Sequence, residues 1–273
     1  MPPAPRRRTL VFVGNCQAEL LQRAAAAVLP PTEFSVAYRS VDSSQPAASD
    51  AADPAPGDIV LLQDIQDVEA LVGYVVSPGA TVLRFPFLRF ASPWPYDDFN
   101  GLRDVVARQQ DDPVLQTTSH YDGILGRLRR LVPDPQARFE AYKARAVPNI
   151  LDPARVHDFE CRRLEALDER FDVRIGRRIV DEFRRVPLFH TVNRPGGALL
   201  AMVLDFVFER LGLGVRSPAA ETLDDLASLQ VPVHPAVADR LSIEWATEDR
   251  RYRQGDSGVT WEQYVRGYIQ RYG

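Results

Sequence analysis

One cysteine lies where a nucleophile is expected in an α/β protein. Residues 9–13 (TLVFV) are apolar and β-branched, as in a strand that is buried on both faces. Gly14-Asn15-Cys16-Gln17 follows, and residues 18–29 (AELLQRAAAAVL) are rich in good helix formers. The order predicts that Cys16 lies at the first turn of a helix, beyond the carboxyl end of a core strand. Open α/β sheets usually place their ligands at that edge.

The predicted position would activate the thiol. A helix N-terminus carries partial positive charge and unpaired N–H groups, which stabilise a thiolate. We therefore expect the pKa of Cys16 to fall below the free value of about 8.5. The same N–H groups would stabilise an oxyanion, and α/β serine hydrolases place their nucleophile on a comparable turn. The alternative is a small buried hydrophobic side chain, a common role of free cysteines.

Two histidines are candidate bases, because a cysteine nucleophile commonly needs an imidazole that the fold brings close. His190 lies within residues 187–195 (PLFHTVNRP), just before an apolar helix predicted over residues 196–211. His120 lies within residues 117–122 (TTSHYD), and its alternative role is in a helix cap. The sequence leaves the choice open. The other two histidines, His157 and His234, are assigned to structure or surface.

Further polar residues are expected to bind substrate. Gln63 ends a predicted strand at residues 58–63, and its amide would orient a substrate, contact an oxyanion or cap the next turn. Asn193 and Arg194 precede a predicted helix N-terminus, which suits an anionic group. Arg84 is a further candidate for a phosphate, although a surface salt bridge is the commoner role of such a residue. The residues predicted to bind the oxyanion or substrate are Gly14, Asn15, Gln17, Gln63 and Asn193.

Alternating strands and helices predict the fold class. Strands over 9–13, 34–39, 58–63 and 81–84, with helices over 18–29 and 64–74, indicate a parallel sheet of flavodoxin-like type. Residues 40–57 are expected to form a loop. The aromatic and proline-rich segment 85–101 is expected to line a substrate site or to cover the core. Further helices are predicted over 101–110, 121–131, 135–145, 152–171, 176–185, 196–211, 219–229, 236–241 and 260–272. We expect one domain, with an α/β core at 9–100 and a large helical C-terminal extension at 101–273.

Composition excludes several classes of protein. A hydrophobic fraction of 45% with 26% charged residues is typical of a globular protein, and a net charge of −4 argues against nucleic-acid binding. No apolar run would span a bilayer or form a signal peptide, so we expect a cytoplasmic protein. The two cysteines make neither a disulfide framework nor a metal site. No P-loop, GxGxxG or HExxH motif is present, which argues against ATP hydrolysis, a nicotinamide cofactor and zinc.

These residues together resemble the WcbI family of bacterial polysaccharide biosynthesis enzymes. The resemblance rests on Gly14-Asn15-Cys16-Gln17, on the strand that ends at Gln63, and on the segment Phe189–Pro195. Relatives often have His-Pro where this chain has Arg194-Pro195, so His120 or His190 would serve as the base. The resemblance implies a core similar to SGNH-type hydrolases, coenzyme A as ligand, and transfer of an acetyl group from acetyl-CoA to a sugar hydroxyl of capsular polysaccharide.

The implied reaction gives the candidate residues their roles. Cys16 would take the acyl group as a thioester or help to bind the donor, while Gln63 and the backbone N–H groups hold the oxyanion. Arg84 or Arg194 would bind the phosphates of coenzyme A. The acceptor would be a glycan or a nucleotide sugar. The alternatives are an esterase or thioesterase with the same residues, and a non-catalytic glycan- or nucleotide-binding protein that uses the aromatic segment.

Overall fold

The computed structural model describes residues 6–40, 55–64, 79–97, 120–147, 149–224 and 229–272. The chain forms two compact units, each assembled from three stretches of sequence. The first unit comprises residues 1–89, 161–182 and 194–226, and the second comprises residues 90–160, 183–193 and 227–273. Helices of the predicted extension therefore lie in the same unit as the predicted sheet. The expectation of one domain, divided at residue 100, stays a prediction.

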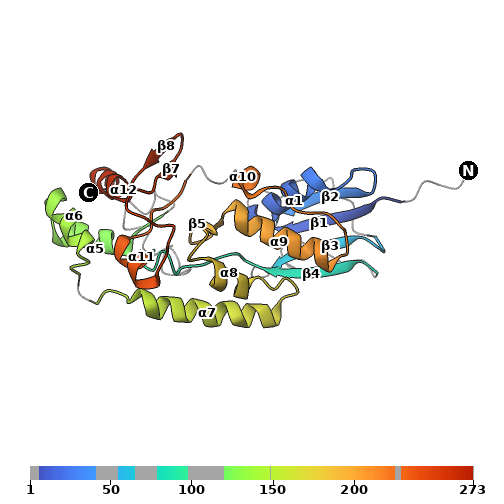
Figure 1. Ribbon diagram of the computed structural model, residues 1–273, viewed down its shortest axis with the longest axis horizontal. Helices are drawn as coiled ribbons and strands as arrows, with labels where there is room; N and C mark the ends of the chain where they lie inside the picture. The colour runs from blue at the N-terminus through green and yellow to red at the C-terminus, as the bar shows by residue number, and fades with distance from the viewer. Residues whose placement is uncertain are drawn as a thin grey trace, which may run out of the picture. The chain divides into compact units, whose positions relative to one another are not determined.

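The first unit contains a four-stranded parallel sheet, which confirms the predicted α/β class (Figure 1). The strand order is β2-β1-β3-β4, and all three pairings are parallel. Similarity to SGNH-type hydrolases stays a prediction. The strands are β1 (Arg8–Gly14), β2 (Phe34–Ser40), β3 (Ile59–Asp64) and β4 (Thr81–Pro86).

The two central strands are buried on both faces. Val11 and Val13 of β1 pack with Val60 and Leu62 of β3 in one apolar cluster. Phe12, which points to the opposite face of the sheet, is also fully buried. Because protein covers both faces, these strands are continuous apolar runs without polar alternation.

Helix α1 (Cys16–Val28) follows β1 directly and packs against β1 and β2. Its buried face is made mainly of small residues, with Ala18, Ala24 and Ala25 beside Leu21. Small side chains allow the helix backbone to lie close to the sheet. This close packing fixes the first turn of α1, which carries Cys16.

The first unit is completed by helices from later in the chain. Helix α9 (Gly197–Arg210) is apolar on most sides, as predicted, and contacts α1 and α10 (Ala220–Leu223). A side chain at Gly197 would meet the backbone carbonyl of Ala220, which explains a glycine at this helix start. Helix α8 (Gly176–Glu182) also belongs to this unit.

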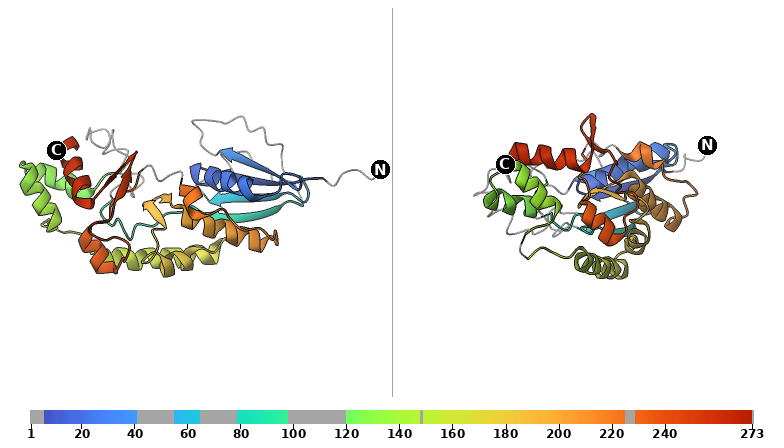
Figure 2. Two further views of the ribbon diagram at one scale, coloured as in Figure 1. Left: turned by 45° about the horizontal axis from the view of Figure 1, so that its top comes forward. Right: turned by 60° about the vertical axis from the view of Figure 1, so that its left-hand side comes forward.

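The second unit contains helices α5 (Gly123–Leu131), α6 (Pro135–Lys143), α11 (Pro235–Leu241) and α12 (Trp261–Tyr272). Helix α6 packs against α5 and α12, and the views of Figures 1 and 2 agree on this grouping. Strands β7 (Tyr252–Gln254) and β8 (Ser257–Val259) form an antiparallel hairpin. Neither this hairpin nor the short strands β5 (Phe189–Thr191) and β6 (Arg194–Pro195) were predicted from the sequence.

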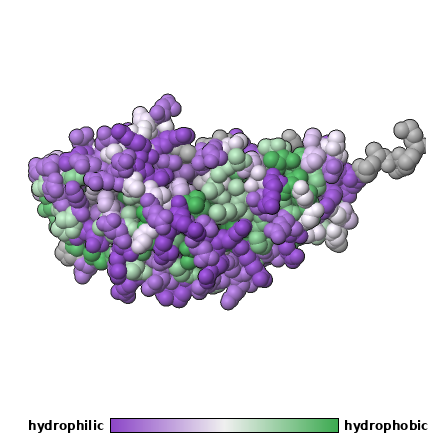
Figure 3. Space-filling view, in the orientation of Figure 1, coloured by the Kyte–Doolittle hydropathy of each residue, from purple (hydrophilic) through white to green (hydrophobic). Residues whose placement is uncertain are grey.

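Helix α7 (Pro153–Arg170) contributes residues to both units. The surface along α7 is mainly hydrophilic (Figure 3), in agreement with its charged sequence. His157 of this helix is half-buried, and its Nδ1 lies 3.1 Å from the Ser92 hydroxyl oxygen. The imidazole also packs against the Phe183 ring, so its role is structural.

No helix among the described residues is long and apolar enough to cross a membrane.

Several sequence predictions fall outside the described residues. The helix predicted over 101–110 lies there entirely, as does most of the loop over 40–57 and of the helix over 64–74. The last residues of the aromatic segment 85–101 lie there as well.

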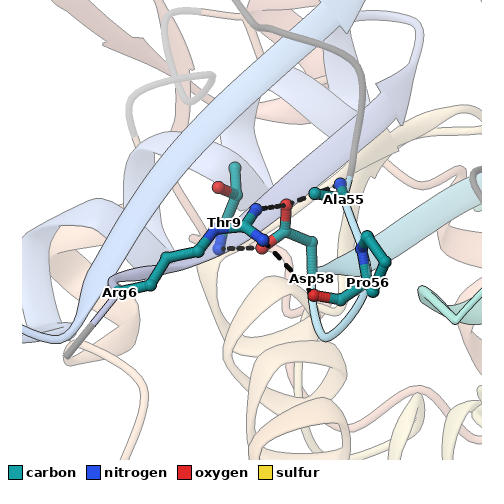
Figure 4. Close-up of polar contacts among 5 residues, drawn as sticks. All are labelled: Arg6, Thr9, Ala55, Pro56 and Asp58. Carbon is teal, nitrogen blue, oxygen red and sulfur yellow. Dashed lines mark hydrogen bonds and ion pairs between the residues drawn. The ribbon is translucent and has the colours of Figure 1, made fainter.

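A buried carboxylate ties the starts of β1 and β3 together (Figure 4). It lies at the amino ends of these strands, whereas Cys16 follows the carboxyl end of β1. Asp58 accepts hydrogen bonds from the backbone N–H groups of Thr9 at 2.9 Å and Ala55 at 2.8 Å. The exposed Arg6 side chain donates a further bond to the same carboxylate at 2.9 Å. The Asp58 side chain is only 4% exposed, whereas the Arg6 side chain is 58% exposed.

We expect Asp58→Ala to lower the free energy of unfolding by about 1–3 kcal/mol, because two backbone donors lose their acceptor. Arg6→Ala should cost less than about 1 kcal/mol, since an exposed ion pair contributes little. Urea denaturation of both variants and the wild type measures the difference. Equal losses in the two variants would contradict this assignment.

Candidate active site

The turn that carries Cys16 is held by its own cap. The Asn15 side-chain oxygen accepts the Gln17 N–H at 2.9 Å, and the Asn15 carbonyl accepts the N–H groups of Ala18 and Glu19. The Asn15 N–H is bound as well, because it donates to the Gln63 side-chain oxygen at 3.0 Å. The Cys16 N–H and Gln17 N–H both lie close enough to the Cys16 sulfur to lower the pKa of the thiol.

A buried network of two glutamine side chains supports this turn. The Gln63 side-chain nitrogen donates to the Gln17 side-chain oxygen at 2.8 Å. Gln17 in turn exchanges two hydrogen bonds with the backbone of Leu88, donating at 2.8 Å and accepting at 3.0 Å. Both glutamines are almost completely buried. The network therefore connects the ends of β1 and β3 to the segment after β4, and in this structure Gln63 contacts Asn15 and Gln17.

Gly14 is required by close packing at the same point. A Cβ at this position would lie 2.7 Å from the Gln63 Cβ and 2.8 Å from the Ala18 Cβ. The phenol of Tyr38 donates to the Gly14 carbonyl at 3.2 Å. The glycine thus lets β1 pass directly over the side chain that orients the turn.

The Cys16 side chain is exposed at the helix start, as predicted, but its pKa is shifted in the opposite direction. Removal of water by the surrounding protein raises the pKa of the Cys16 thiol, and the charge of Glu19 raises it further. The positive charge of Arg194 and the two N–H groups oppose this rise without overcoming it. The expectation of a lowered pKa was wrong, because it counted the helix terminus and left desolvation out. At neutral pH the thiol is therefore mainly protonated, and a nucleophilic Cys16 needs a base.

The charges around Cys16 predict opposite shifts for two substitutions. Arg194→Gln removes the cation that lowers the thiol pKa, so the pKa should rise. The pH profile of the rate of alkylation by iodoacetamide should therefore move to higher pH than in the wild type. Glu19→Gln removes the anion that raises the pKa, so the same profile should move to lower pH. The rates are followed on Cys16 by peptide mass spectrometry. Shifts of the same sign in both variants would contradict this electrostatic account.

The candidate base His190 lies in the second unit, on β5, and is buried. Its Nδ1 lies 3.3 Å from the Gln230 side-chain nitrogen. The Gln230 oxygen accepts the Arg253 N–H at 3.0 Å, which fixes the orientation of the amide. Gln230 therefore donates to Nδ1, and the proton of a neutral His190 lies on Nε2. In this tautomer, the Nε2 atom is a hydrogen-bond donor.

The other candidate, His120, is also in the second unit and lies just before α5. The helix cap is supplied by Asp122, whose carboxylate accepts the N–H groups of Ile124 and Leu125. His120 is mostly buried and lines a pocket with several aromatic side chains. Asp122, which sequence reasoning left out of the site, thus has the capping role considered for residues near His120.

The units separate the predicted site residues into two groups. The first unit holds Cys16, Gly14, Asn15, Gln17, Gln63, Arg84 and Arg194, and the second holds His120, His190 and Asn193. Within the first group, Arg194 is half-buried and acts electrostatically on Cys16, whereas Arg84 is exposed on β4. In the second group, Asn193 is exposed and its side-chain oxygen accepts the Thr191 hydroxyl at 3.2 Å.

Two supporting residues were absent from the sequence analysis. Gln230 sets the tautomer of His190, and the Leu88 backbone completes the Gln17–Gln63 network. Gln230 is an isolated amide between predicted elements, and the contact of Leu88 involves only backbone atoms. Neither leaves a signal in a single sequence. No group of metal-binding side chains is found among the described residues.

Comparisons with known proteins identify the family. A solved structure matches this chain with a TM-score of 0.64 and 15% identity, covering 97% of this chain and 91% of that one. That structure is described as WcbI, a polysaccharide biosynthesis enzyme, in its native form without a disulfide bond between coenzyme A and a cysteine. No curated protein matches the chain. The model of the family described as "Polysaccharide biosynthesis enzyme WcbI" matches residues 9–216. Since this match spans about three quarters of the sequence, the chain belongs to the WcbI family of polysaccharide biosynthesis enzymes.

Proposed function

We propose that this protein transfers an acyl group, most simply acetyl, from acyl-CoA to a sugar hydroxyl during polysaccharide biosynthesis. The observation that carries the proposal is the exposed Cys16 thiol at the start of α1, beside the cationic Arg194. Family membership supports a sugar as acceptor. The coenzyme A and cysteine named for the related WcbI structure support the donor. This donor also agrees with the cytoplasmic location that we expect.

The reaction proceeds in two acyl transfers. A base removes the Cys16 proton, and the sulfur attacks the thioester carbonyl of the donor, so that coenzyme A leaves as its thiol. A sugar hydroxyl then attacks the Cys16 thioester as a base removes the hydroxyl proton. The products are an O-acyl sugar and the free Cys16 thiol. In the alternative role, Cys16 binds the donor and the sugar attacks acyl-CoA directly.

The Cys16 N–H is the backbone donor best placed for the oxyanion. The N–H groups of Asn15, Gln17, Ala18 and Glu19 all have acceptors within the turn or its support. The Cys16 N–H lies near its own sulfur and would meet the oxygen of an acyl group held there. Gln63 acts through Asn15 and Gln17 and is a positioning residue.

The positive charges of this unit suit the phosphates of coenzyme A. Arg194 and the partial charge of the α1 N-terminus both favour an anion near Cys16. Arg84 faces solvent on β4, two strands from β1, or roughly 10 Å at the usual strand spacing. Both arginines could form bidentate contacts with phosphate oxygens.

The tautomer of His190 favours different roles for the two histidines. With its proton on Nε2, His190 would donate a hydrogen bond to a carbonyl or an oxyanion, whereas removing a proton through Nε2 requires the other tautomer. His120 is then the base for the sugar hydroxyl.

We expect His120→Gln to lower kcat for acetyl transfer by about 10²–10³-fold, because glutamine cannot accept a proton from the hydroxyl. His190→Gln should cost about tenfold or less, since an amide still donates a hydrogen bond. His190→Leu removes the donor and should cost more than His190→Gln. Equal, large losses in His190→Gln and His190→Leu would show instead that His190 is the base.

The proposal is tested with acetyl-CoA and capsule-type polysaccharide as the acceptor. Release of the coenzyme A thiol is measured with and without acceptor, and the glycan is examined for acetyl ester by NMR. Transfer predicts that the acceptor stimulates release and becomes acetylated. Release into water without acetylated glycan would indicate a thioesterase. Binding of acetyl-CoA without any release would indicate a non-catalytic binding protein.

A further inference from the structure

The second unit contains a pocket whose walls are mainly aromatic. Its empty space is about 540 Å³ when the solvent at its open mouth is included. The rings come from several separate parts of the chain, among them the segment after β4, the residues before α5, and α12. They include Trp94, Tyr96, Tyr121, Trp261, Tyr264 and Tyr268.

A wider groove, of about 970 Å³ including its open side, shares part of this wall. His120, Tyr264 and Tyr268 line both the pocket and the groove. Three tyrosines follow one another along α12 at intervals of four residues, with ring centroids 6.4 Å apart for Tyr264 and Tyr268 and 4.8 Å apart for Tyr268 and Tyr272. Together they form a row of half-buried rings along the groove.

The polar groups of the pocket are acidic or neutral. Asp97 and Asp122 contribute carboxylates, and none of the described residues that line the pocket is lysine or arginine. Asp122 is used structurally, because it caps α5 and accepts the Tyr142 hydroxyl at 2.6 Å. His234 is also used structurally: its Nδ1 accepts the Ala236 N–H, and burial lowers its pKa to about 4.

One hydroxyl of the wall offers a donor to a ligand. The Tyr268 hydroxyl is buried and makes no hydrogen bond of ordinary geometry to a described residue, although the Asp122 N–H lies close enough to lower its pKa. Burial dominates and raises the pKa of Tyr268, so the phenol keeps its proton at neutral pH. A buried hydroxyl without an acceptor costs free energy, which a ligand hydroxyl would recover.

We propose that the aromatic pocket and its groove bind the acceptor sugar, with pyranose rings on the α12 tyrosines and hydroxyls at Asp97 and Tyr268. The inference rests on the proposed function for the identity of the acceptor. Aromatic faces pack against the C–H face of a sugar, and carboxylates accept its hydroxyl hydrogens. His120 lines both spaces, which places the candidate base beside the bound hydroxyls.

A sugar suits this site better than the nucleotide of coenzyme A does. Adenine would also stack on aromatic rings, but the two carboxylates of the pocket repel phosphates, and none of the described residues that line the pocket is a cation. The groove has one lining cation, Arg271, among its described residues. The cation and helix terminus that suit phosphates lie in the first unit, at Arg194 and α1.

Tryptophan fluorescence tests the site directly. Two of the three tryptophans, Trp94 and Trp261, line the pocket, so occupancy should change the emission. The full chain is titrated with the methyl glycosides of glucose, galactose and mannose and with N-acetylglucosamine, each without acetyl-CoA. We expect a saturable change with at least one of them. No saturable change with any sugar, in protein that is folded by circular dichroism, would overturn the proposal.

Variants of the full chain locate the bound sugar. Tyr264→Ala should weaken binding by about tenfold and Tyr264→Phe should not, since stacking needs only the ring. Asp97→Asn should weaken sugar binding by about threefold to tenfold. Arg266→Ala, on α12 outside the lining, is the matched control. If ADP binds in place of sugars, and Asp97→Asn strengthens that binding, the pocket is a nucleotide site and the proposal fails.

The two proposals fail in different ways. Cys16→Ala should leave sugar binding unchanged, because Cys16 lines neither the pocket nor the groove. Sugar binding without acetyl transfer would overturn the proposed reaction and retain the sugar site. Acetyl transfer that is unaffected by Tyr264→Ala and Asp97→Asn, at sugar concentrations below KM, would overturn the sugar site and retain the reaction.

Discussion

Cys16→Ala is expected to lower kcat/KM for acetyl transfer by about 10³-fold or more, because removal of a nucleophile removes the covalent route and leaves only binding and oxyanion stabilisation. Cys16→Ser should also be strongly impaired, since an alcohol ionises far less readily than a thiol. The rates are measured from thiol release under saturating acceptor. Both variants keep the Asn15 cap and the Gln63 network, which involve no atom of the Cys16 side chain.

Cys161→Ser is the matched control for these variants. Cys161 lies on α7, is partly exposed, and has no part in the turn at α1, so its substitution should leave kcat unchanged. Full kcat in Cys16→Ala would contradict the covalent mechanism. Full kcat with a raised KM for acetyl-CoA would assign Cys16 to binding of the donor.

The second large effect is expected from Gly14→Ala. The added methyl group would overlap the Gln63 side chain and the Ala18 Cβ at 2.8 Å, and α1 cannot retreat without losing its packing on the sheet. We expect a loss of about 1–3 kcal/mol in stability, because overpacking forces side chains and backbone to shift. Activity should fall with it, since the same shift breaks the Gln63 bond to the Asn15 N–H.

Gly267→Ala provides the control for a glycine substitution. Gly267 is exposed within α12, and a Cβ there would meet no atom within 4 Å. Alanine should stabilise this helix by about 0.5–1 kcal/mol. Thermal unfolding followed by circular dichroism compares the two variants. A Gly14→Ala protein as stable as the wild type would contradict the packing that we assign to this turn.

The fold could be predicted where local pattern and packing agree. The runs at β1 and β3 are apolar because both faces are covered, and α1 begins directly after Asn15, a good cap, so these elements were confirmed to within two residues at each end. The hairpin of β7 and β8 was missed, because its strands are three residues each and their polar sequence has no clear period. The division into two units also left no signal, since one of its boundaries falls within α7, between residues 160 and 161.

The site was predictable in position but not in electrostatics. The place of Cys16 follows from one strand, one turn and one helix, which are all local. Its pKa depends on desolvation and on Arg194, a residue 178 positions later in the sequence (194 − 16), so no local pattern reports it. The same holds for His190, whose tautomer is set by Gln230 and, through it, by Arg253.

The most direct test of the account is the mass of the Cys16 peptide during turnover. The protein is mixed with acetyl-CoA without acceptor, quenched in acid and cleaved with trypsin, which releases Cys16 within residues 9–23 and Cys161 within residues 156–162. We predict one acetyl group on the peptide 9–23, which disappears when acceptor is added, and none on the peptide 156–162. Acetylation of the glycan while the peptide 9–23 stays unmodified at every time point would contradict a Cys16 thioester.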